Sequence, residues 1–106
     1  MQVAVTGSSG LIGSALVAAL RADGHQVTRL VRTGPAAPDA LVWDPRAERG
    51  GLGPRSLDGM TAVVHLAGAG VADKRWTDSY RAEIRDSRVG GTRALVAALT
   101  AMAAPP

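Results

Sequence analysis

The sequence predicts an α/β fold, a doubly wound parallel sheet whose strands, numbered along the chain, lie in the order 3-2-1-4. Two observations predict this fold. Short runs of strand-forming residues alternate with stretches whose apolar residues recur at helical spacing. A glycine-rich stretch separates the first strand-like run from the first helical stretch. Strands joined through helices have right-handed crossovers, which make the sheet parallel and place the first strand centrally.

The first half of the chain is expected to form three strands and one helix. The first two strands are Gln2–Thr6 and Gln26–Val31, and a shorter third strand covers 40–43. A loop rich in glycine and proline follows over 45–54. Between the first two strands, apolar residues recur at helical spacing. They are Leu11, Ala15, Ala18, Ala19 and Ala22, with Ile12, Leu16 and Leu20 beside them.

The second half is expected to form one strand and one long helix. The run 61–66 is apolar throughout its middle, as in a strand that is covered on both faces. Thr77 is a good N-cap for a helix that extends to about Met102. Gly90 and Gly91 weaken the middle of this helix by roughly 1 kcal/mol each, so we expect a kink or a close contact there.

Composition excludes several classes of protein. The 106 residues are room for one domain, and 12 basic against 9 acidic residues give a net charge of +3. The basic residues are dispersed and only three aromatic residues are present, which argues against a nucleic-acid partner. No run is apolar enough to span a membrane, no cleavable signal pattern begins the chain, and it has no Cys. We expect a cytoplasmic domain with no membrane partner and no metal.

The glycine-rich stretch predicts a binding site for a dinucleotide. Gly7 permits the turn off the first strand, Gly10 lets the backbone approach a pyrophosphate, and Gly13 lets the helix pack closely. The first amides of that helix would point at the phosphates, with Ser8 and Ser9 as additional hydroxyl donors. The alternative is a tight strand-to-helix turn without a ligand.

The end of the second strand indicates which dinucleotide is bound. An acid there would hold the ribose 2′-hydroxyl of NAD, whereas an Arg suits the 2′-phosphate of NADP. The sequence has Arg32 at this place, and the nearest following acid is Asp39. Arg32 therefore predicts NADP(H), unless it is simply a solvated residue at the strand end.

Five motifs occur together along the chain. They are residues 6–13, Trp43-Asp44-Pro45, His65-Leu66-Ala67-Gly68, Arg75-Trp76-Thr77 and residues 84–92. Together they resemble the N-terminal half of the epimerase-like family of atypical, extended short-chain dehydrogenases/reductases, often labelled NAD-dependent epimerase/dehydratase or nucleoside-diphosphate-sugar epimerase. The resemblance covers essentially the whole chain.

The resemblance implies a Rossmann fold that binds NADP(H), with 1–106 as the N-terminal half of the cofactor domain. The residue pattern supports one of the implied contacts, because Arg88 lies on an apolar helix stripe and needs an anion there. That anion is a cofactor phosphate, or an internal acid such as Glu83 or Asp86. The implied cofactor contacts are Gly7, Ser8, Ser9, Gly10, Leu11, Ile12, Gly13, Val31, Arg32, Leu66, Ala67, Gly68, Glu83 and Arg88.

The chain also departs from the family pattern. Extended members use a Tyr and a Lys four residues later for acid–base chemistry, but Tyr80 is followed at that distance by Ile84. Lys74, the one lysine, precedes Tyr80. We therefore expect the cofactor half of an oxidoreductase or epimerase whose catalytic residues, and the half that binds its small-molecule substrate, are absent here. The alternative is a non-catalytic NADP(H) sensor.

His65 and the fourth strand carry two further expectations. His65 is expected either to face a nicotinamide or to form a hydrogen bond at its strand end. The fourth strand is expected to lie at an edge of the sheet, with no fifth strand beside it. Because an unpaired edge is a template for pairing, the isolated chain is expected either to self-associate there or to be marginally stable.

Overall fold

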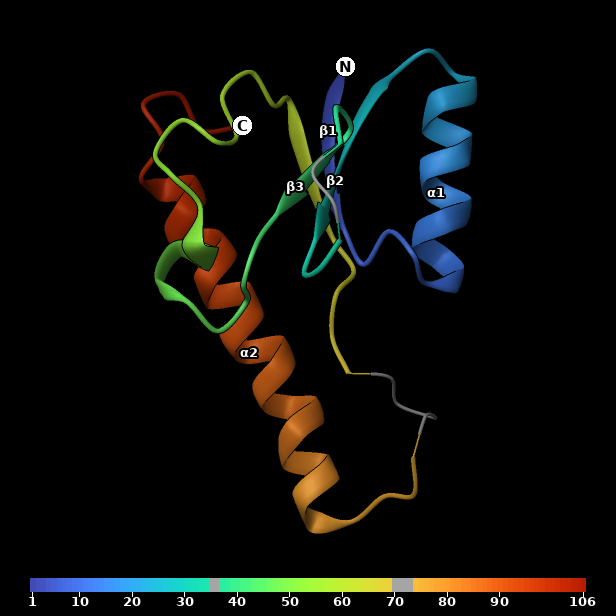
Figure 1. The fold of residues 1–106 in the computed structure, drawn as a ribbon, viewed down its shortest axis with the longest axis vertical. Helices are drawn as coiled ribbons and strands as arrows, with labels where there is room; N and C mark the ends of the chain where they lie inside the picture. The colour runs from blue at the N-terminus through green and yellow to red at the C-terminus, as the bar shows by residue number, and fades with distance from the viewer. Residues whose placement is uncertain (35–36, 70–73) are drawn as a thin grey trace.

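Four parallel strands form a single sheet in this computed structural model (Figure 1). The sheet order is β3-β2-β1-β4, as the sequence predicts, and β1 is central. The strands are β1 (Gln2–Thr6), β2 (Gln26–Val31), β3 (Ala40–Val42) and β4 (Ala62–His65). The structure describes residues 1–34, 37–69 and 74–106. None of the helices in these ranges is both long enough and apolar enough to cross a membrane.

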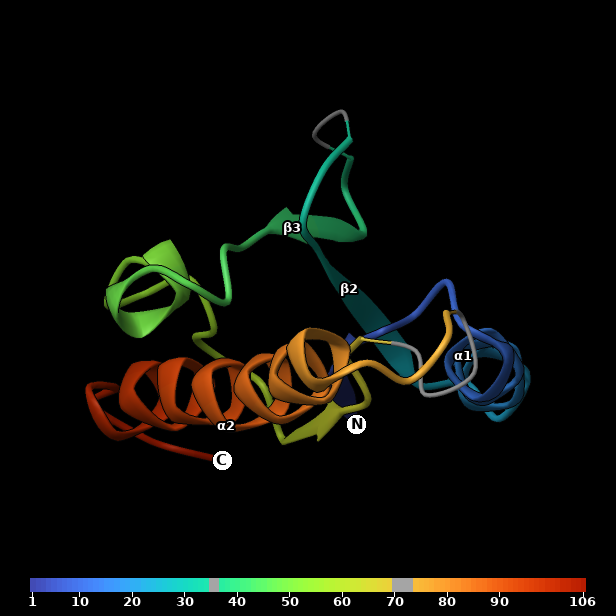
Figure 2. The same cartoon turned by 90° about the horizontal axis from the view of Figure 1, so that it is seen from below.

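Two helices cover opposite faces of the sheet (Figures 1 and 2). α1 (Leu11–Ala22) packs with the face that carries Val3 and Val5. α2 (Asp78–Thr100) packs with the face that carries Ala4. Successive residues of a strand point to opposite faces, so β1 contributes to both cores and is covered on both sides.

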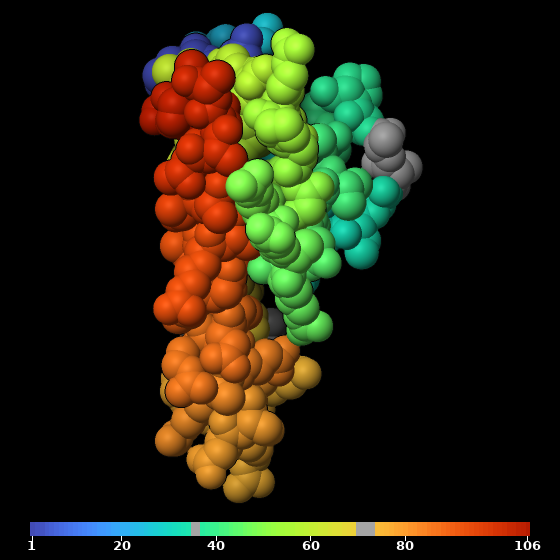
Figure 3. All heavy atoms as spheres, turned by 90° about the vertical axis from the view of Figure 1, so that its left-hand side faces the viewer, coloured from blue at the N-terminus to red at the C-terminus, as the bar shows by residue number. Residues whose placement is uncertain are grey.

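The segment between β3 and β4 lies against the C-terminal half of α2, as Figure 3 shows. It contains a short 3₁₀ turn, η1 (Glu48–Gly51), which the prediction of a featureless loop missed. β3 ends at Val42, one residue earlier than predicted. Trp43 then turns inward, only 2% exposed, and joins Leu52 and Leu95 in the core. This buried indole fixes the path of the chain beyond β3.

The predicted apolar face of α1 is only partly correct. Leu16 and Leu20 are half-buried and pack against the core, but Ile12 is 70% exposed. Gly13 and Val17 are its buried residues, whereas the alanines of the predicted face are exposed and Leu11 is 90% exposed. The rotation of α1 is set by Gly13, which packs against the backbone of the loop that precedes the helix. That contact turns Val17 toward the sheet, because residues four apart share a helix face.

The prediction for α2 is confirmed in most respects. Thr77 caps the helix, since its hydroxyl accepts a hydrogen bond of 3.1 Å from the Tyr80 amide. The helix runs without interruption through Gly90 and Gly91. Gly91 is buried, and a β-carbon there would lie 3.6 Å from the Pro45 side chain. Of the two alternatives at this glycine pair, the structure therefore shows the close contact.

Candidate functional site

The loops that follow β1 and β4 meet at the carboxyl end of the sheet. Gly7 begins the first loop with a φ of +68°, a conformation that favours glycine. A β-carbon at Gly7 would lie 2.7 Å from the Leu66 carbonyl carbon and 2.9 Å from the Ala67 nitrogen. Gly7 is therefore required for its turn, as predicted, and also because the two loop backbones are in contact.

Thr6 joins these two loops by hydrogen bonds. Its hydroxyl is fully buried and accepts from the amides of Leu66 and Ala67 at 3.0 and 3.1 Å. The same oxygen lies 2.7 Å from His65 Nδ1. Two amides occupy both lone pairs of the hydroxyl, so its hydrogen is donated to His65 Nδ1. One buried threonine thus fixes the start of the loop after β4.

His65 is consequently neutral, with its hydrogen on Nε2. Burial lowers the pKa of its imidazole below the ordinary value, which also favours the neutral form. The ring meets the Trp43 ring edge-on at 6.0 Å, and Nε2 has no hydrogen-bond partner in the described ranges. Of the two roles expected for His65, the structure shows the hydrogen bond at the strand end.

The first turn of α1 holds no group that would compete with a bound anion. Gly10 is the N-cap, and neither a side-chain cap nor an acidic residue occupies the first turn. A β-carbon on Gly10 would approach only the Gly7 carbonyl oxygen, at 3.4 Å, so the backbone there is open. The first amides of a helix carry partial positive charge, and nothing in the first turn neutralises it here.

The other predicted residues of this loop have separate places. Ser8 is buried and Ser9 is exposed, while Leu11 and Ile12 are 90% and 70% exposed at the start of α1. A β-carbon on Gly13 would collide with the Gly7 carbonyl oxygen. The close packing predicted for Gly13 is therefore with the loop rather than with the sheet.

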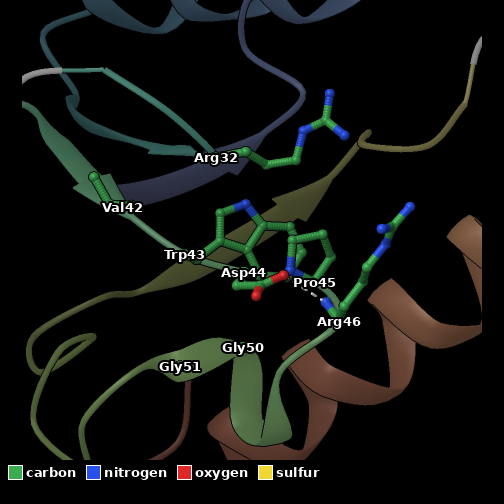
Figure 4. A pocket seen from close by; sticks show the side chains of 8 residues that line it. All are labelled: Arg32, Val42, Trp43, Asp44, Pro45, Arg46, Gly50 and Gly51. Carbon is green, nitrogen blue, oxygen red and sulfur yellow. Dashed lines mark hydrogen bonds between the residues drawn. The ribbon is translucent and has the colours of Figure 1, made fainter.

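Arg32 lies beside a surface cavity of about 480 Å³ at the carboxyl ends of β2 and β3 (Figure 4). It is exposed, and it follows Val31, the last residue of β2. Its guanidinium has no hydrogen-bond or ion-pair partner in the described part of the chain. The cavity is lined by Arg32, Val42, Trp43, Asp44, Pro45, Arg46, Gly50 and Gly51.

Asp39, the nearest acid after β2, is occupied by two arginines. Its carboxylate accepts hydrogen bonds from Arg29 at 3.0 and 3.1 Å and from Arg21 at 2.7 Å. These bonds lower the pKa of Asp39 to about 2. Neither Arg21, Arg29 nor Asp39 lines the cavity. The Asp39 carboxylate therefore connects α1 and β2 to the turn before β3.

Arg88 lies on α2 beside the loop that follows β4. Arg88 Nη1 donates to the Ala69 carbonyl at 2.9 Å, and its side chain packs on Gly68. In the described part of the chain, no ion pair joins Arg88 to Glu83 or Asp86, the two acids named for it. Glu83 is exposed on the same helix.

Ser87 is a contributor that the sequence reasoning missed. Its hydroxyl accepts from the Ala69 amide at 3.0 Å and donates to the Ile84 carbonyl. Ser87 and Arg88 thus hold both the amide and the carbonyl of Ala69. The sequence feature that could have indicated Ser87 is its position directly before Arg88 in the motif 84–92.

The parallel sheet, its central β1 and the glycine turn at the end of β1 define a Rossmann-type domain of the nucleotide-binding class. The chain belongs to the NAD dependent epimerase/dehydratase family, whose model matches residues 3–105. This membership confirms the family resemblance of the sequence.

Related proteins agree with this assignment. Epimerase family protein Mb2239 of Mycobacterium bovis is 48% identical over 97 residues, which are 92% of this chain and 32% of that protein. The crystal structure of human epimerase family protein SDR39U1 with NADPH matches with a TM-score of 0.81 and 33% identity, over 100% of this chain and 34% of that one. The chain thus spans about a third of the length of these relatives.

A third similar structure contains the other nicotinamide dinucleotide. It is a short-chain dehydrogenase/reductase superfamily protein from Agrobacterium tumefaciens with bound NAD. It matches with a TM-score of 0.67 and 29% identity, over 95% of this chain and 30% of that one. Solved structures similar to this chain therefore include both an NADPH complex and an NAD complex.

Proposed function

We propose that this chain binds NADP(H) and forms the cofactor-binding part of an oxidoreductase or epimerase. The observation that carries the proposal is the open N-terminus of α1 beside the loop of β4, at the switch point of the sheet. A pyrophosphate at Gly10 would meet backbone amides, and the first turn of α1 holds no carboxylate that would compete with it. The NADPH in the human relative's structure supports the same class of ligand.

The preference for NADP(H) over NAD(H) is proposed to come from Arg32. NADP differs from NAD by a phosphate on the adenosine ribose, and a guanidinium forms charge-assisted hydrogen bonds with such a phosphate. Arg32 is exposed and unpaired at the end of β2, while Asp39 is held by Arg21 and Arg29. Asp39, the nearest acid that could accept a hydrogen bond from the 2′-hydroxyl of NAD, is therefore occupied by these two arginines.

The remaining proposed contacts come from the loop after β4 and from α2. They are Leu66, Ala67 and Gly68, the first two of which have amides held by the Thr6 hydroxyl. Arg88 lies beside Ala69 on α2, and Glu83 belongs to the same helix. When bound, the cofactor would supply hydride transfer, and the protein would supply orientation and electrostatics.

Residues for substrate and for acid–base chemistry are proposed to lie in the additional length that the relatives have. Within this chain Tyr80 is buried and is followed at the fourth position by Ile84. Lys74 Nζ lies over the Tyr80 ring, 5.6 Å from its centre, and not beside a reactive hydroxyl. The lack of a Tyr with a Lys four residues later in this sequence favours the second candidate function, an NADP(H) sensor that binds the cofactor without turnover.

Calorimetric titration of the folded chain with NADPH and with NADH tests the proposal. NADPH is expected to bind at least about tenfold more tightly, and Arg32→Gln should remove most of that difference. Arg55→Gln is the matched control, because Arg55 is 90% exposed and pairs with Asp58 outside the cavity. A folded chain that binds neither dinucleotide would contradict the proposal.

The two candidate functions differ in what the protein does after binding. An enzyme with the additional length of its relatives would transfer hydride from C4 of NADPH to a carbonyl substrate, or from a sugar-nucleotide substrate to C4 of NADP⁺ and back to the opposite face of the sugar. The first reaction lowers absorbance at the nicotinamide band, whereas the second leaves no net change in absorbance and is detected by the epimerised product. A sensor would bind NADPH with the same affinity and do neither. Binding with constant absorbance and no epimerised product, over a panel of carbonyl and sugar-nucleotide substrates, would favour the sensor.

A further inference from the structure

A second arginine, Arg46, lines the cavity beside Arg32. The ends of β2 and β3 lie next to each other, since Val31 pairs with Val42 in parallel register. The residues that follow the two strands therefore border one cavity, and Arg32 and Arg46 both line it. Figure 4 shows the two side chains extending to the same side of the Trp43 and Pro45 rings.

The backbone of Arg46 is held in place by its neighbours. Its amide donates to Asp44 Oδ1 at 2.9 Å, which closes a tight turn around Pro45. Trp43 anchors this turn in the core, and a β-carbon on Gly50 would lie 3.0 Å from the indole. The position from which the Arg46 side chain extends is therefore fixed by buried contacts.

The charges at this cavity are unbalanced. The lining residues include two guanidinium groups and one carboxylate, that of Asp44. The Asp44 carboxylate accepts from the Arg46 backbone amide, as the dashed line in Figure 4 shows, and forms no ion pair with either guanidinium. In the described part of the chain neither Arg32 nor Arg46 has a partner for its guanidinium, so the cavity is suited to an anion with more than one charge.

We propose that Arg46 is a specificity-determining residue that binds, together with Arg32, the phosphate on the adenosine ribose of NADP(H). This inference rests on the proposed function and adds a second cation to the same site. A phosphate monoester carries close to two negative charges near neutral pH and has three acceptor oxygens. Two guanidinium groups can satisfy them from two sides, whereas the 2′-hydroxyl of NAD offers neither charge nor several acceptors.

Titrations with two pairs of nucleotides test the inference. NADP⁺ is compared with NAD⁺, and adenosine 2′-monophosphate with adenosine 5′-monophosphate, for the wild type, Arg46→Gln and Arg32→Gln. Arg46→Gln is expected to weaken NADP⁺ and adenosine 2′-monophosphate by about tenfold, which is the loss of one charge-assisted hydrogen bond. NAD⁺ and adenosine 5′-monophosphate should change by less than about twofold, which is a small difference in binding free energy.

Arg55→Gln is again the matched control, since it removes one positive charge from outside the cavity. It should leave all four affinities unchanged. If Arg46→Gln leaves NADP⁺ binding unchanged, or weakens NADP⁺ and NAD⁺ equally, Arg46 is not a specificity residue. In that case a selective loss in Arg32→Gln would still support the proposed function. If the folded wild type binds none of the nucleotides, both proposals are wrong.

Discussion

The hydroxyl of Thr6 and the imidazole of His65 form a hydrogen bond of 2.7 Å between the carboxyl ends of β1 and β4. The two residues are register partners in neighbouring parallel strands. Thr6 also accepts the first two amides of the loop that follows β4. The contact between the loops that follow β1 and β4 therefore depends on one buried hydroxyl group.

Thr6→Val is predicted to lower the free energy of unfolding by about 3 kcal/mol, because valine keeps the shape but leaves buried polar groups unpaired. Those groups are the Ala67 amide and Nδ1 of His65, whereas the Leu66 amide keeps its hydrogen bond of 3.3 Å to the Thr6 backbone carbonyl. Urea unfolding followed by circular dichroism measures the loss. Thr6→Ser keeps the hydroxyl and should retain most of the stability. Equal stabilities for the two variants would contradict the role of the hydroxyl.

Gly10→Ala and Gly13→Ala are predicted to separate ligand binding from folding. Gly10 has a φ of −72°, and its added β-carbon meets only one atom, at 3.4 Å, so stability should change by less than about 1 kcal/mol. The same methyl group would occupy the proposed path of the pyrophosphate, so NADPH binding should weaken by at least about tenfold.

Gly13→Ala should instead destabilise the fold by about 2 kcal/mol or more, since its β-carbon would collide with the Gly7 carbonyl oxygen. Thermal unfolding and NADPH titration of both variants provide the comparison. Normal NADPH affinity in Gly10→Ala would show that no phosphate approaches the backbone there.

Local patterns predicted the elements whose causes are local. The order of the sheet, the turn at Gly7 and the cap at Thr77 follow from strand runs, glycine spacing and capping chemistry. The rotation of α1 did not follow, because Leu11 and Val17 are both apolar. The path of the loop before the helix, which packs the Gly7 carbonyl on Gly13, selects Val17 for burial.

Only part of the candidate site could be predicted from the sequence, namely the residues whose positions depend on local features. Gly10 and Arg32 occupy places that the chain order itself defines, at the ends of β1 and β2. Arg46 follows a loop-like stretch, and its place at the cavity depends on the burial of Trp43. The bond between Thr6 and His65 joins residues 59 positions apart, which no local pattern reports.

The chain is predicted to self-associate through the outer edge of β4. Only β1 pairs with this strand among the described residues, so the backbone groups of the other edge are available for pairing. Sedimentation velocity should show an average mass that rises with concentration, and the β4 amides should exchange more slowly at high concentration. A monodisperse monomer with a sharp unfolding transition would contradict this prediction.

Acid is predicted to destabilise the fold through Asp39. Its pKa is about 2 in the folded chain and 3.8 is its ordinary value, and the hydrogen bonds from Arg29 and Arg21 cause the difference. Between these values the unfolded chain binds more protons, so stability rises with pH. The contribution of Asp39 is fully present above pH 3.8 and is lost as the pH falls toward 2.

Asp39→Asn should therefore flatten the acid limb of a stability-against-pH curve, measured by urea unfolding at a series of pH values. It should also lower stability near neutral pH, because Arg21 and Arg29 lose their shared carboxylate. Asp58→Asn is the matched control, since it removes the carboxylate of an exposed ion pair with Arg55. If both variants have the same acid limb as the wild type, the carboxylate of Asp39 does not brace α1 against β2 in solution.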